Sequence, residues 1–515
     1  MIQATPRTIR ELHELLLPVG VDLVGTLRER LYGLTSNTEA MRGVDGFSLV
    51  LLVRLPKTRV AGGEVESEEL RAFAFKGPLS AVAREVSSLS CDTDENRMVD
   101  ASENVELVPL NPRPGLTRAL AAEVNGQHPN ASHVIAVGLG SLGSQVVVNL
   151  VRGGFGQWTL VDNDLLQPHN MGRHALGSWA VGWPKAIGLA EMLNTIVEGP
   201  AIAHGVVESV GRLNAPTKRS PAEWRSASTI LDMSASIAVA RYLCHNIQSS
   251  ARRVSLFLNP SGTALTLLAE DRERSVPLDF LEMQHYRALT HDTDLAGLLS
   301  PPSTMRSGVG CRDVSTQIPQ DMVSVFAGIG SRSIRRTDET DRAQIVTWKL
   351  DEPTDSIICT EIEVSGVHRR KENGWRIFFD STLERRLRDY RNAKLPSETG
   401  GILIGSSDMG RRIIYVVDAT EAPRDSQECP HGFLRGSQGL QQAVQRIQEA
   451  TSGMLGYIGE WHSHPPKTTA DPSIADRKVM EWVKETLDDE GQVGIVGIVG
   501  SKRRLNFILC GSTLY

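Results

Sequence analysis

Residues 133–143, HVIAVGLGSLG, decide the fold of the central part of this chain. The apolar run His133 to Val137 is typical of a buried strand, and a helix-like run follows from Ser144 to Arg152. The turn between them contains three glycines, Gly138, Gly140 and Gly143. Such glycines let backbone N–H groups approach a phosphate, and the N-terminus of the helix adds partial positive charge. The stretch therefore predicts a nucleotide-binding loop in a doubly wound α/β sheet.

Residues after the next expected strand indicate which nucleotide is bound. The strand Trp158 to Val161 ends at Asp162, where an acid can hold a ribose hydroxyl. Polar and charged residues follow at Asp164, Asn170, Arg173 and Lys185. A dehydrogenase needs no such cluster, whereas a site that holds the triphosphate of ATP during attack on its α-phosphorus does. The pattern therefore favours nucleotidyl transfer from ATP.

The segments GLGSLGS and DNDLLQPHNMGR, followed by Lys185, resemble the ThiF/MoeB and ubiquitin-activating enzyme family. The resemblance implies a Rossmann-like adenylation domain that forms a homodimer. It also implies that Asp162 holds the ribose and that Asp164 fills the second acidic position of the family pattern. Asp232, after the expected strand Ser228 to Leu231, is then the candidate ligand for Mg²⁺, although the later acid usual in the family is missing. The phosphate contacts implied are those of Asn170, Arg173 and Lys185.

A thioester step after adenylation would need a reachable cysteine whose thiolate is stabilised by positive charge. Cys311 is the best candidate, because it lies in a glycine-containing loop between Arg306 and Arg312. Cys244 and Cys510 fall in apolar helical and strand patterns, so we expect them in the core. The family resemblance agrees with this choice, since activating enzymes carry their cysteine on a loop after the nucleotide-binding sheet.

A second kind of chemistry is indicated near the C-terminus, where residues 460–465 read EWHSHP. His462 and His464 project to the same side of an extended segment, and Asp476 on the next expected helix can complete a three-ligand zinc site with one position open for water. Glu398, where another strand begins, can act as the base that activates this water, and the Ser473 hydroxyl can stabilise an oxyanion. This pattern predicts metal-assisted hydrolysis.

The same residues resemble the JAB1/MPN/Mov34 metalloprotease family, whose pattern is a distant Glu, then HxHP, then Ser-x-x-Asp. The resemblance covers residues 374–515. It implies that Glu398 is the general base, that Ser473 is the oxyanion donor, and that the zinc ligands are His462, His464 and Asp476. All five positions of the pattern are filled, so the resemblance implies an active enzyme rather than a scaffold.

Composition and pattern also predict how the chain is divided. We expect a small N-terminal α+β domain of unknown role at 1–112, the Rossmann-like domain with a mainly parallel sheet at 113–340, a linker at 341–372, and a separate mixed α/β JAB/MPN domain at 373–515. The net charge of −6 argues against a nucleic acid or an anionic membrane as partner. Widely spaced cysteines and the lack of a membrane-spanning run favour a cytoplasmic protein.

The two resemblances together imply one substrate class, a ubiquitin-like carrier protein that ends in Gly. The first domain would adenylate the carrier with ATP and Mg²⁺ and form a thioester, and the second would use Zn²⁺ to cleave after the same Gly, either to process a precursor or to release a conjugate. A conjugating enzyme and a role in antiphage defence are further expectations. The alternative is activation and trimming of a sulfur carrier for thiocarboxylate formation, and a non-enzymatic scaffold would require both sites to be dead.

Overall fold

The structure is a computed structural model of the 515-residue chain. It describes residues 5–35, 48–60, 63–88, 105–113, 115–212, 222–301, 303–306, 314–501 and 505–510. The chain forms two compact units, residues 1–115 and residues 116–515. Each unit has its own hydrophobic core, and each is described separately below. In the described part, no helix is both long enough and apolar enough to cross a bilayer.

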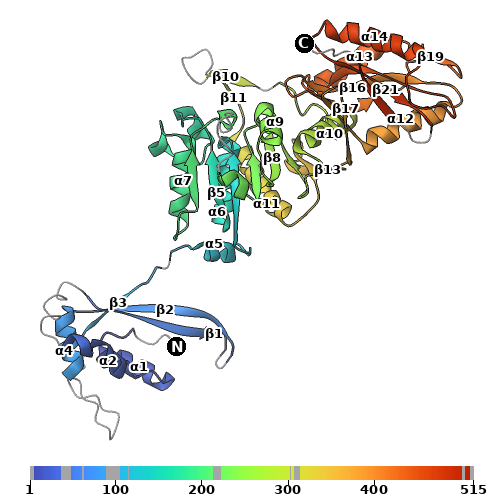
Figure 1. The fold of residues 1–515 in the computed structure, drawn as a ribbon. Helices are drawn as coiled ribbons and strands as arrows, with labels where there is room; N and C mark the ends of the chain where they lie inside the picture. The colour runs from blue at the N-terminus through green and yellow to red at the C-terminus, as the bar shows by residue number, and fades with distance from the viewer. Residues whose placement is uncertain are drawn as a thin grey trace. The chain divides into compact units, whose positions relative to one another are not determined.

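The first unit is a three-stranded antiparallel sheet with helices packed on it (Figure 1). Its strands are β1 (Val50–Thr58), β2 (Val65–Phe75) and β3 (Leu107–Leu110), and its helices are α1 (Ile9–Leu16), α2 (Leu23–Thr35) and α4 (Leu79–Ser88). The helical pattern in residues 8–31 is broken between α1 and α2, because Pro18 ends the first helix and Gly20 adopts a positive φ of 81°.

The second unit contains an eight-stranded sheet in the order β13-β12-β9-β8-β7-β4-β5-β6. The five strands from β8 to β6 run parallel, which confirms the mainly parallel sheet, whereas β9, β12 and β13 extend it in antiparallel fashion. The strands are β4 (Asn130–Val137), β5 (Phe155–Val161), β6 (Ala203–Val206), β7 (Thr229–Asp232), β8 (Arg252–Leu258), β9 (Ala264–Ala269), β12 (Gln344–Asp351) and β13 (Ser356–Ile362).

Helices cover both faces of this sheet, as expected of a doubly wound fold. One face packs against α6 (Ser141–Arg152), α7 (Lys185–Ile196) and α11 (Gln320–Asp338). The other face packs against α8 (Ala222–Ser226), α9 (Ile237–His245) and α10 (Leu278–His291). The short helix α5 (Arg118–Val124) precedes β4, and a small hairpin, β10 (Thr304–Arg306) with β11 (Val314–Thr316), precedes α11.

A second sheet in the same unit has the order β14-β15-β17-β16-β20-β21-β22. It is formed by β14 (Val367–Glu372), β15 (Trp375–Asp380), β16 (Gly400–Asp408), β17 (Ile413–Ala419), β20 (Gly456–Ser463), β21 (Gly494–Val499) and β22 (Leu505–Cys510). Helices α12 (Ser381–Lys394), α13 (Leu440–Ala450) and α14 (Ile474–Asp488) pack around it, and β18 (Gln427–Cys429) with β19 (Gly432–Leu434) forms a hairpin. This is the expected mixed α/β domain.

Residues 341–372, which we expected to be a linker, instead form strands β12, β13 and β14. Strand β12 pairs with β9 and with β13, and β14 is the edge strand of the second sheet. Two of the three are edge strands, β13 and β14, and edge strands tolerate many charged side chains. The charged composition of β14, VHRRKE, therefore resembles that of a connection, although this strand pairs with β15 along its whole length.

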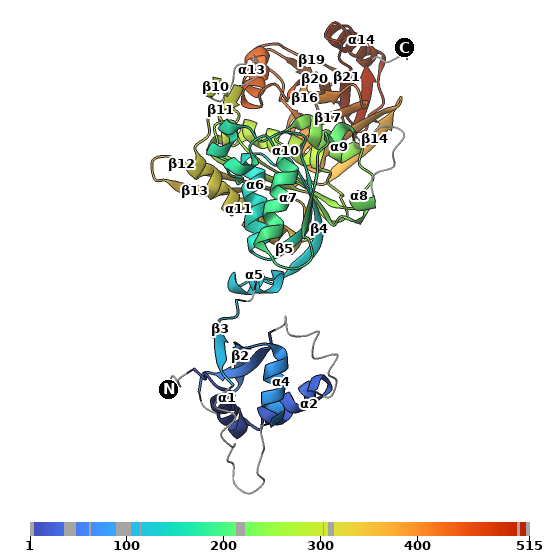
Figure 2. The same ribbon diagram turned by 90° about the vertical axis from the view of Figure 1, so that its left-hand side faces the viewer.

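The two sheets of the second unit share one hydrophobic core through α10, which lies against β16 and β17 in both views (Figures 1 and 2). Phe280 and Met283 of α10 pack with Phe378, Ile404 and Tyr415 of the second sheet. The opposite face of that sheet is covered by its own helix α12. The C-terminal domain therefore has its own sheet but buries one face of it against the preceding domain.

Candidate functional sites

The predicted nucleotide-binding loop lies at the carboxyl ends of three neighbouring parallel strands. Val137 at the end of β4 is in register with Val161 of β5 and with Asp232 of β7. Gly138 has a φ of 83°, and a Cβ there would collide with the backbone of Ser234. A Cβ at Gly140 would meet no atom within 4 Å. Tight packing beneath the loop and open space above it leave room for phosphate groups at the N-terminus of α6.

The acidic residues after β5 hold this loop in place. The Asp162 carboxylate accepts hydrogen bonds from the backbone N–H groups of Leu139, at 2.7 Å, and Asp164, at 2.8 Å. Lys185, at the start of α7, is buried and forms an ion pair with Asp164 at 2.9 Å. Burial raises the pKa of Asp162. Asp162, Asp164 and Lys185 thus lie beside the glycine loop, and Asp162 braces it in addition to any contact with a ribose.

The remaining two residues of the predicted phosphate cluster lie on a short 3-10 helix, Pro168–Gly172, and its C-cap. The side-chain carbonyl of Asn170 accepts the backbone N–H of Gln167 at 2.9 Å. The Arg173 guanidinium donates to the carbonyl of Ile318 at 3.1 Å, and its own carbonyl accepts from Gln145 of α6. The structure therefore ties Arg173 to α6 beside the loop and to the segment before α11.

Asp232 lies at the end of β7 and borders a cavity of about 290 Å³. Its carboxylate accepts hydrogen bonds from the N–H and the hydroxyl of Ser234, at 3.0 and 2.6 Å. Burial raises the pKa of Asp232 to about 6. The cavity is largely apolar and ends at Ser452 and Met454, in the turn between α13 and β20 of the C-terminal domain. The cavity thus runs from Asp232 to the second domain.

These residues fit ATP and a divalent cation. The open space at Gly140 lies at a helix N-terminus, where phosphates are favoured, and a buried carboxylate with few donors around it gains from a neighbouring cation. Bound Mg²⁺ would neutralise phosphate charge beside Asp232. Cys311, the predicted thioester cysteine, lies outside the described residues. Cys244 and Cys510 are buried, as expected.

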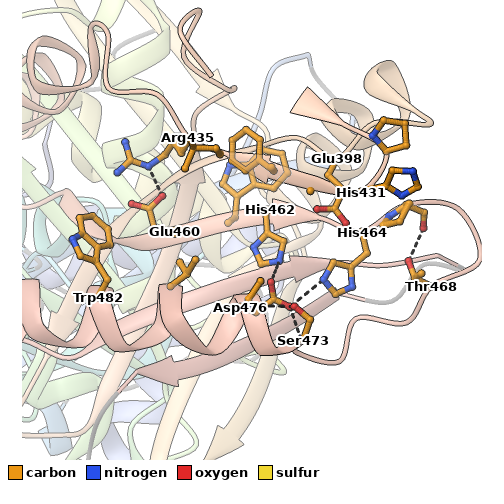
Figure 3. Close-up of a pocket in the computed structure, with 18 residues that line it drawn as sticks. Glu398, His431, Arg435, Glu460, His462, His464, Thr468, Ser473, Asp476 and Trp482 are labelled. Atoms are coloured by element: carbon orange, nitrogen blue, oxygen red, sulfur yellow. Dashed lines mark hydrogen bonds and ion pairs between the residues drawn. The ribbon is translucent and has the colours of Figure 1, made fainter. Parts of the chain in front are cut away.

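The predicted zinc ligands converge at one point (Figure 3). Strand β20 carries His462, and His464 follows the end of this strand, while Asp476 lies in the first turn of α14. The Nε2 atom of His462 lies 2.9 Å from one Asp476 oxygen, and Nε2 of His464 lies 3.3 Å from the other. Possible ligand atoms of all three residues lie within 4.8 Å of one another. Burial alone would raise the pKa of Asp476, but interactions with the two histidines outweigh this effect and lower the pKa.

Hydrogen-bond geometry at these ligands fits a metal ion. The His462 Nε2 atom is buried and makes no hydrogen bond, although a carboxylate oxygen is 2.9 Å away. The carbonyl of Thr469 lies 2.7 Å from Nδ1 of His464, which places the proton on Nδ1 and leaves the Nε2 lone pair facing Asp476. Two imidazole nitrogens and a carboxylate are a typical ligand set for catalytic zinc. When bound, zinc would polarise a water molecule or a carbonyl group.

Glu398 and Ser473 border the same point. Glu398 precedes β16, whose Gly400 is in register with His462, and its side chain points toward the two histidines (Figure 3). Burial raises the pKa of Glu398. Ser473 is the N-cap of α14, where its hydroxyl oxygen accepts the N–H of Asp476 at 3.2 Å and leaves the hydroxyl proton free to donate. The capping box therefore places both Ser473 and Asp476 at the site.

A cleft of about 600 Å³ extends from this site between the β18–β19 hairpin and α14. Its far end contains three residues that the sequence pattern does not reveal, Arg435, Glu460 and Trp482 (Figure 3). Arg435 forms an ion pair with Glu460 at 2.6 Å and lies 5.8 Å from the ring centre of Trp482. His431, in the turn between β18 and β19, is exposed and lines the cleft. Of these three residues, only Trp482 carries a signal in the sequence, because it is a large aromatic residue on the expected helix; the structure places its ring at the surface of α14.

Comparison with known proteins identifies two families in this chain. Residues 118–250 match the ThiF family, and residues 380–504 match the prokaryotic homologues of the JAB domain. A CD-NTase/cGAS isopeptidase of Enterobacter hormaechei is 30% identical over 136 residues, which are 26% of this chain and 73% of that protein.

Two further relatives match longer stretches of the chain. The uncharacterised protein y4oA of Sinorhizobium fredii is 25% identical over 243 residues, 42% of this chain. The ATP-dependent ubiquitin transferase-like protein Cap2 of Pseudomonas aeruginosa is 24% identical over 242 residues, 43% of this chain. The chain spans 41% of the length of each of these two relatives. The chain therefore belongs to the ThiF family through residues 118–250 and to the prokaryotic JAB family through residues 380–504.

Proposed function

We propose that this chain activates a ubiquitin-like carrier protein with ATP and cleaves the bond after the terminal Gly of the same carrier. The observation that carries the proposal is the presence, in one compact unit, of a glycine loop beside buried Asp232 and of a histidine–carboxylate cluster beside Glu398. Relatives named as a ubiquitin transferase-like protein and as an isopeptidase support the two halves separately.

In the activation step, the C-terminal carboxylate of the carrier attacks the α-phosphorus of ATP, forms an acyl adenylate and displaces pyrophosphate. The N-terminus of α6, Arg173 and Lys185 hold the phosphates, and Asp162 keeps the loop in the shape that accepts them. The extended tail of the carrier fits the cavity that runs from Asp232 to Met454, because its apolar lining and narrow volume suit small residues. Cys311 is the proposed acceptor of the activated acyl group.

In the cleavage step, Glu398 takes a proton from the attacking water and returns it to the leaving amine. Ser473 donates a hydrogen bond to the oxyanion that forms on the scissile carbonyl. His462, His464 and Asp476 would hold zinc, which supplies Lewis acidity when bound. The residues before the cut would lie in the cleft between the β18–β19 hairpin and α14, with Arg435 and Trp482 at its far end.

The test of activation is pyrophosphate exchange, measured with the full chain, ATP, Mg²⁺ and a carrier ending in Gly. Arg173→Ala and Asp232→Ala should each abolish exchange and leave proteolysis intact, whereas Cys311→Ala should retain exchange and lose the thiol-sensitive adduct with the carrier. Undiminished exchange in Asp232→Ala would remove this residue from the metal role. Transfer of sulfur to the adenylated carrier, without transfer to a cysteine of a conjugating enzyme, would favour the sulfur carrier alternative.

The test of cleavage compares a variant that lacks a proposed zinc ligand with a variant that lacks the proposed general base. His464→Ala should lose both bound zinc and hydrolysis, because it removes a ligand, whereas Glu398→Gln should keep zinc and lose hydrolysis. Metal content is measured by elemental analysis and hydrolysis with a carrier extended beyond its Gly. Loss of zinc in Glu398→Gln would make Glu398 a ligand, and hydrolysis that survives a chelator would overturn the assignment of this domain.

A further inference from the structure

A basic cleft with no assigned role lies where the two sheets of the second unit meet. Its volume is about 820 Å³, and none of the described residues that line it also lines the cavity at Asp232 or the cleft at the histidine cluster. Among the described residues that line it, one is an acid, Glu273, and six are arginine or lysine: Arg272, Arg274, Arg369, Arg370, Lys371 and Arg376. The whole chain carries a net charge of −6, so this concentration of positive charge is opposite to the average of the molecule.

The register of β14 and β15 places like charges against each other. Lys371 of β14 lies directly opposite Arg376 of β15, and Arg369 lies opposite Phe378. Side chains alternate along a strand, so Arg369, Lys371 and Arg376 share one face, with Arg369 and Lys371 about 7 Å apart along β14. Like charges directly opposite each other destabilise a sheet. The contact between Lys371 and Arg376 is therefore unfavourable without a ligand and becomes favourable when an anion lies between the two side chains.

Among the described residues, no carboxylate forms an ion pair with Arg369, Lys371 or Arg376. The Arg369 guanidinium donates to the carbonyl of Ser275, a neutral partner, at 2.9 Å. Within the described ranges, neither Lys371 nor Arg376 lies in an ion pair. Glu372 is adjacent in sequence but faces the other side of β14, where its carboxylate accepts the N–H of Leu509 at 3.3 Å.

The other side of the cleft comes from the loop after β9 and is partly neutralised. Arg272 pairs with Asp341 at 2.5 Å, and Arg274 pairs with the buried Glu270 at 2.7 Å. These pairs fix the loop opposite β14 and β15, and the Arg369 bond to Ser275 links the loop to β14. The cleft is therefore a built concavity with walls from both domains, one wall carrying unpaired positive charge.

We propose that this cleft binds a small ligand with two or more phosphate groups. A terminal phosphate carries nearly two negative charges and a bridged phosphate carries about one, and both offer several acceptor oxygens in a compact volume that the guanidinium fork matches. An acidic peptide carries at most one charge per residue, about 3.3 Å apart, and cannot concentrate its charge between Lys371 and Arg376 to the same degree. A bounded cleft of about 820 Å³ is in the size range of small-molecule sites, whereas the continuous backbone of a nucleic acid needs an extended basic surface.

The experiment is calorimetric titration of the full chain with inorganic tripolyphosphate at low salt. The starting protein carries Arg173→Ala, which weakens the nucleotide site, so that the difference between variants of the basic cleft dominates the measured binding. We expect saturable binding in this protein and a loss of at least about tenfold in affinity when Lys371→Thr and Arg376→Thr are added, since each removes hydrogen bonds to a charged ligand. Arg342→Thr, an exposed cation outside the cleft, is the matched control and should change nothing.

Thermal unfolding provides a second readout, because removing the cleft cations should not lower the midpoint without ligand but should abolish the stabilisation by tripolyphosphate. Without ligand, Lys371→Thr should leave the midpoint unchanged or raise it, because a like-charge contact is removed. With tripolyphosphate, only the protein that keeps Lys371 and Arg376 should gain stability. The proposal is overturned if the Arg173→Ala protein binds no tripolyphosphate, if Arg342→Thr weakens binding as much as the cleft variants, or if an oligoglutamate peptide competes with equal affinity.

Discussion

Replacement of Arg287 by methionine should destabilise the whole second unit, not the central domain alone. Arg287 of α10 donates two hydrogen bonds to the two carboxylate oxygens of Asp380, at 3.0 and 2.7 Å, and a third to the carbonyl of Val417. Asp380 is 0% exposed, and it is also the N-cap of α12. The pair thus joins a helix of one domain to a strand and a helix of the next.

The size of the effect follows from what the substitution leaves behind. Asp380 would keep one donor, the N–H of Leu383 at 2.8 Å, but its charge would be buried without a cation. Removal of one partner from a buried ion pair costs about 3–5 kcal/mol, a large part of a typical unfolding free energy of about 5–15 kcal/mol. With an unfolding entropy of about 2.1 cal/mol/K per residue, a unit of 400 residues should lose about 4–6 °C in its midpoint.

The assay is guanidinium and thermal unfolding of the full chain, followed by tryptophan fluorescence. Arg342→Met is the control, because Arg342 and Glu361 form an exposed pair at 3.3 Å, and removal of such a pair costs about 0–1 kcal/mol. Adding Asp380→Asn to Arg287→Met removes the stranded charge, and the asparagine carbonyl can still cap Leu383, so the double variant should recover about 2 kcal/mol. A loss below about 1 kcal/mol for Arg287→Met, or no recovery in the double variant, would refute the reasoning.

Three further outcomes follow from the structure. Met454→Trp should fill the cavity next to Asp232 and lower carrier-dependent pyrophosphate exchange by about a hundredfold, with hydrolysis of an extended carrier as the unchanged control. Burial lowers the pKa of His285 to about 4, so the unfolded chain binds this proton more tightly than the folded chain does. Stability should therefore fall as the pH drops from about 6.5 to 4. In denaturant titrations across this range, His285→Phe should lose about 3 kcal/mol less unfolding free energy than the wild type. A chelator should lower the thermal midpoint of the wild-type chain and leave that of His464→Ala unchanged, and an equal shift in both would contradict the metal site.

The sequence was sufficient for those parts of the sites that lie in local motifs. The glycine loop and the pair His462 and His464 are set by strand, turn and helix patterns a few residues long, so their spacing predicts their geometry. Asp476 was predictable because the capping box that begins at Ser473 fixes the first turn of α14. Local propensity and the site chemistry agree at these positions.

Features that depend on distant segments were not predictable in this way. Arg435, Glu460 and Trp482 meet in the cleft from a loop, a strand and a helix, and no spacing in the sequence brings them together. The sequence predicts a linker at residues 341–372 because the charged side chains of the edge strand β14 resemble those of a connection. Only the strands with which these residues pair, β9 for β12 and β15 for β14, distinguish a strand from a linker here.

Helix α10 shows most clearly why the domain junction is hidden in the sequence. Eleven of its fourteen residues are buried, although LDFLEMQHYRALTH mixes polar and apolar residues as a surface helix does. Several of its polar groups find partners in segments after the central sheet: Asp279 accepts the hydroxyl of Tyr415 at 2.6 Å, Gln284 donates to the carbonyl of Ser365, and Arg287 meets Asp380.

An apolar stripe could be covered by many partners, but buried charges and amides require a partner with matching groups in fixed places. The polar content of α10 therefore indicates a specific junction rather than exposure to solvent. Because the same helix also carries Phe280 and Met283 into the shared core, separating the two domains at the expected linker would expose an apolar sheet face and leave several charges unpaired. The proposed activation and cleavage sites are consequently held in one body, and under this proposal a carrier released from one would have to move to reach the other.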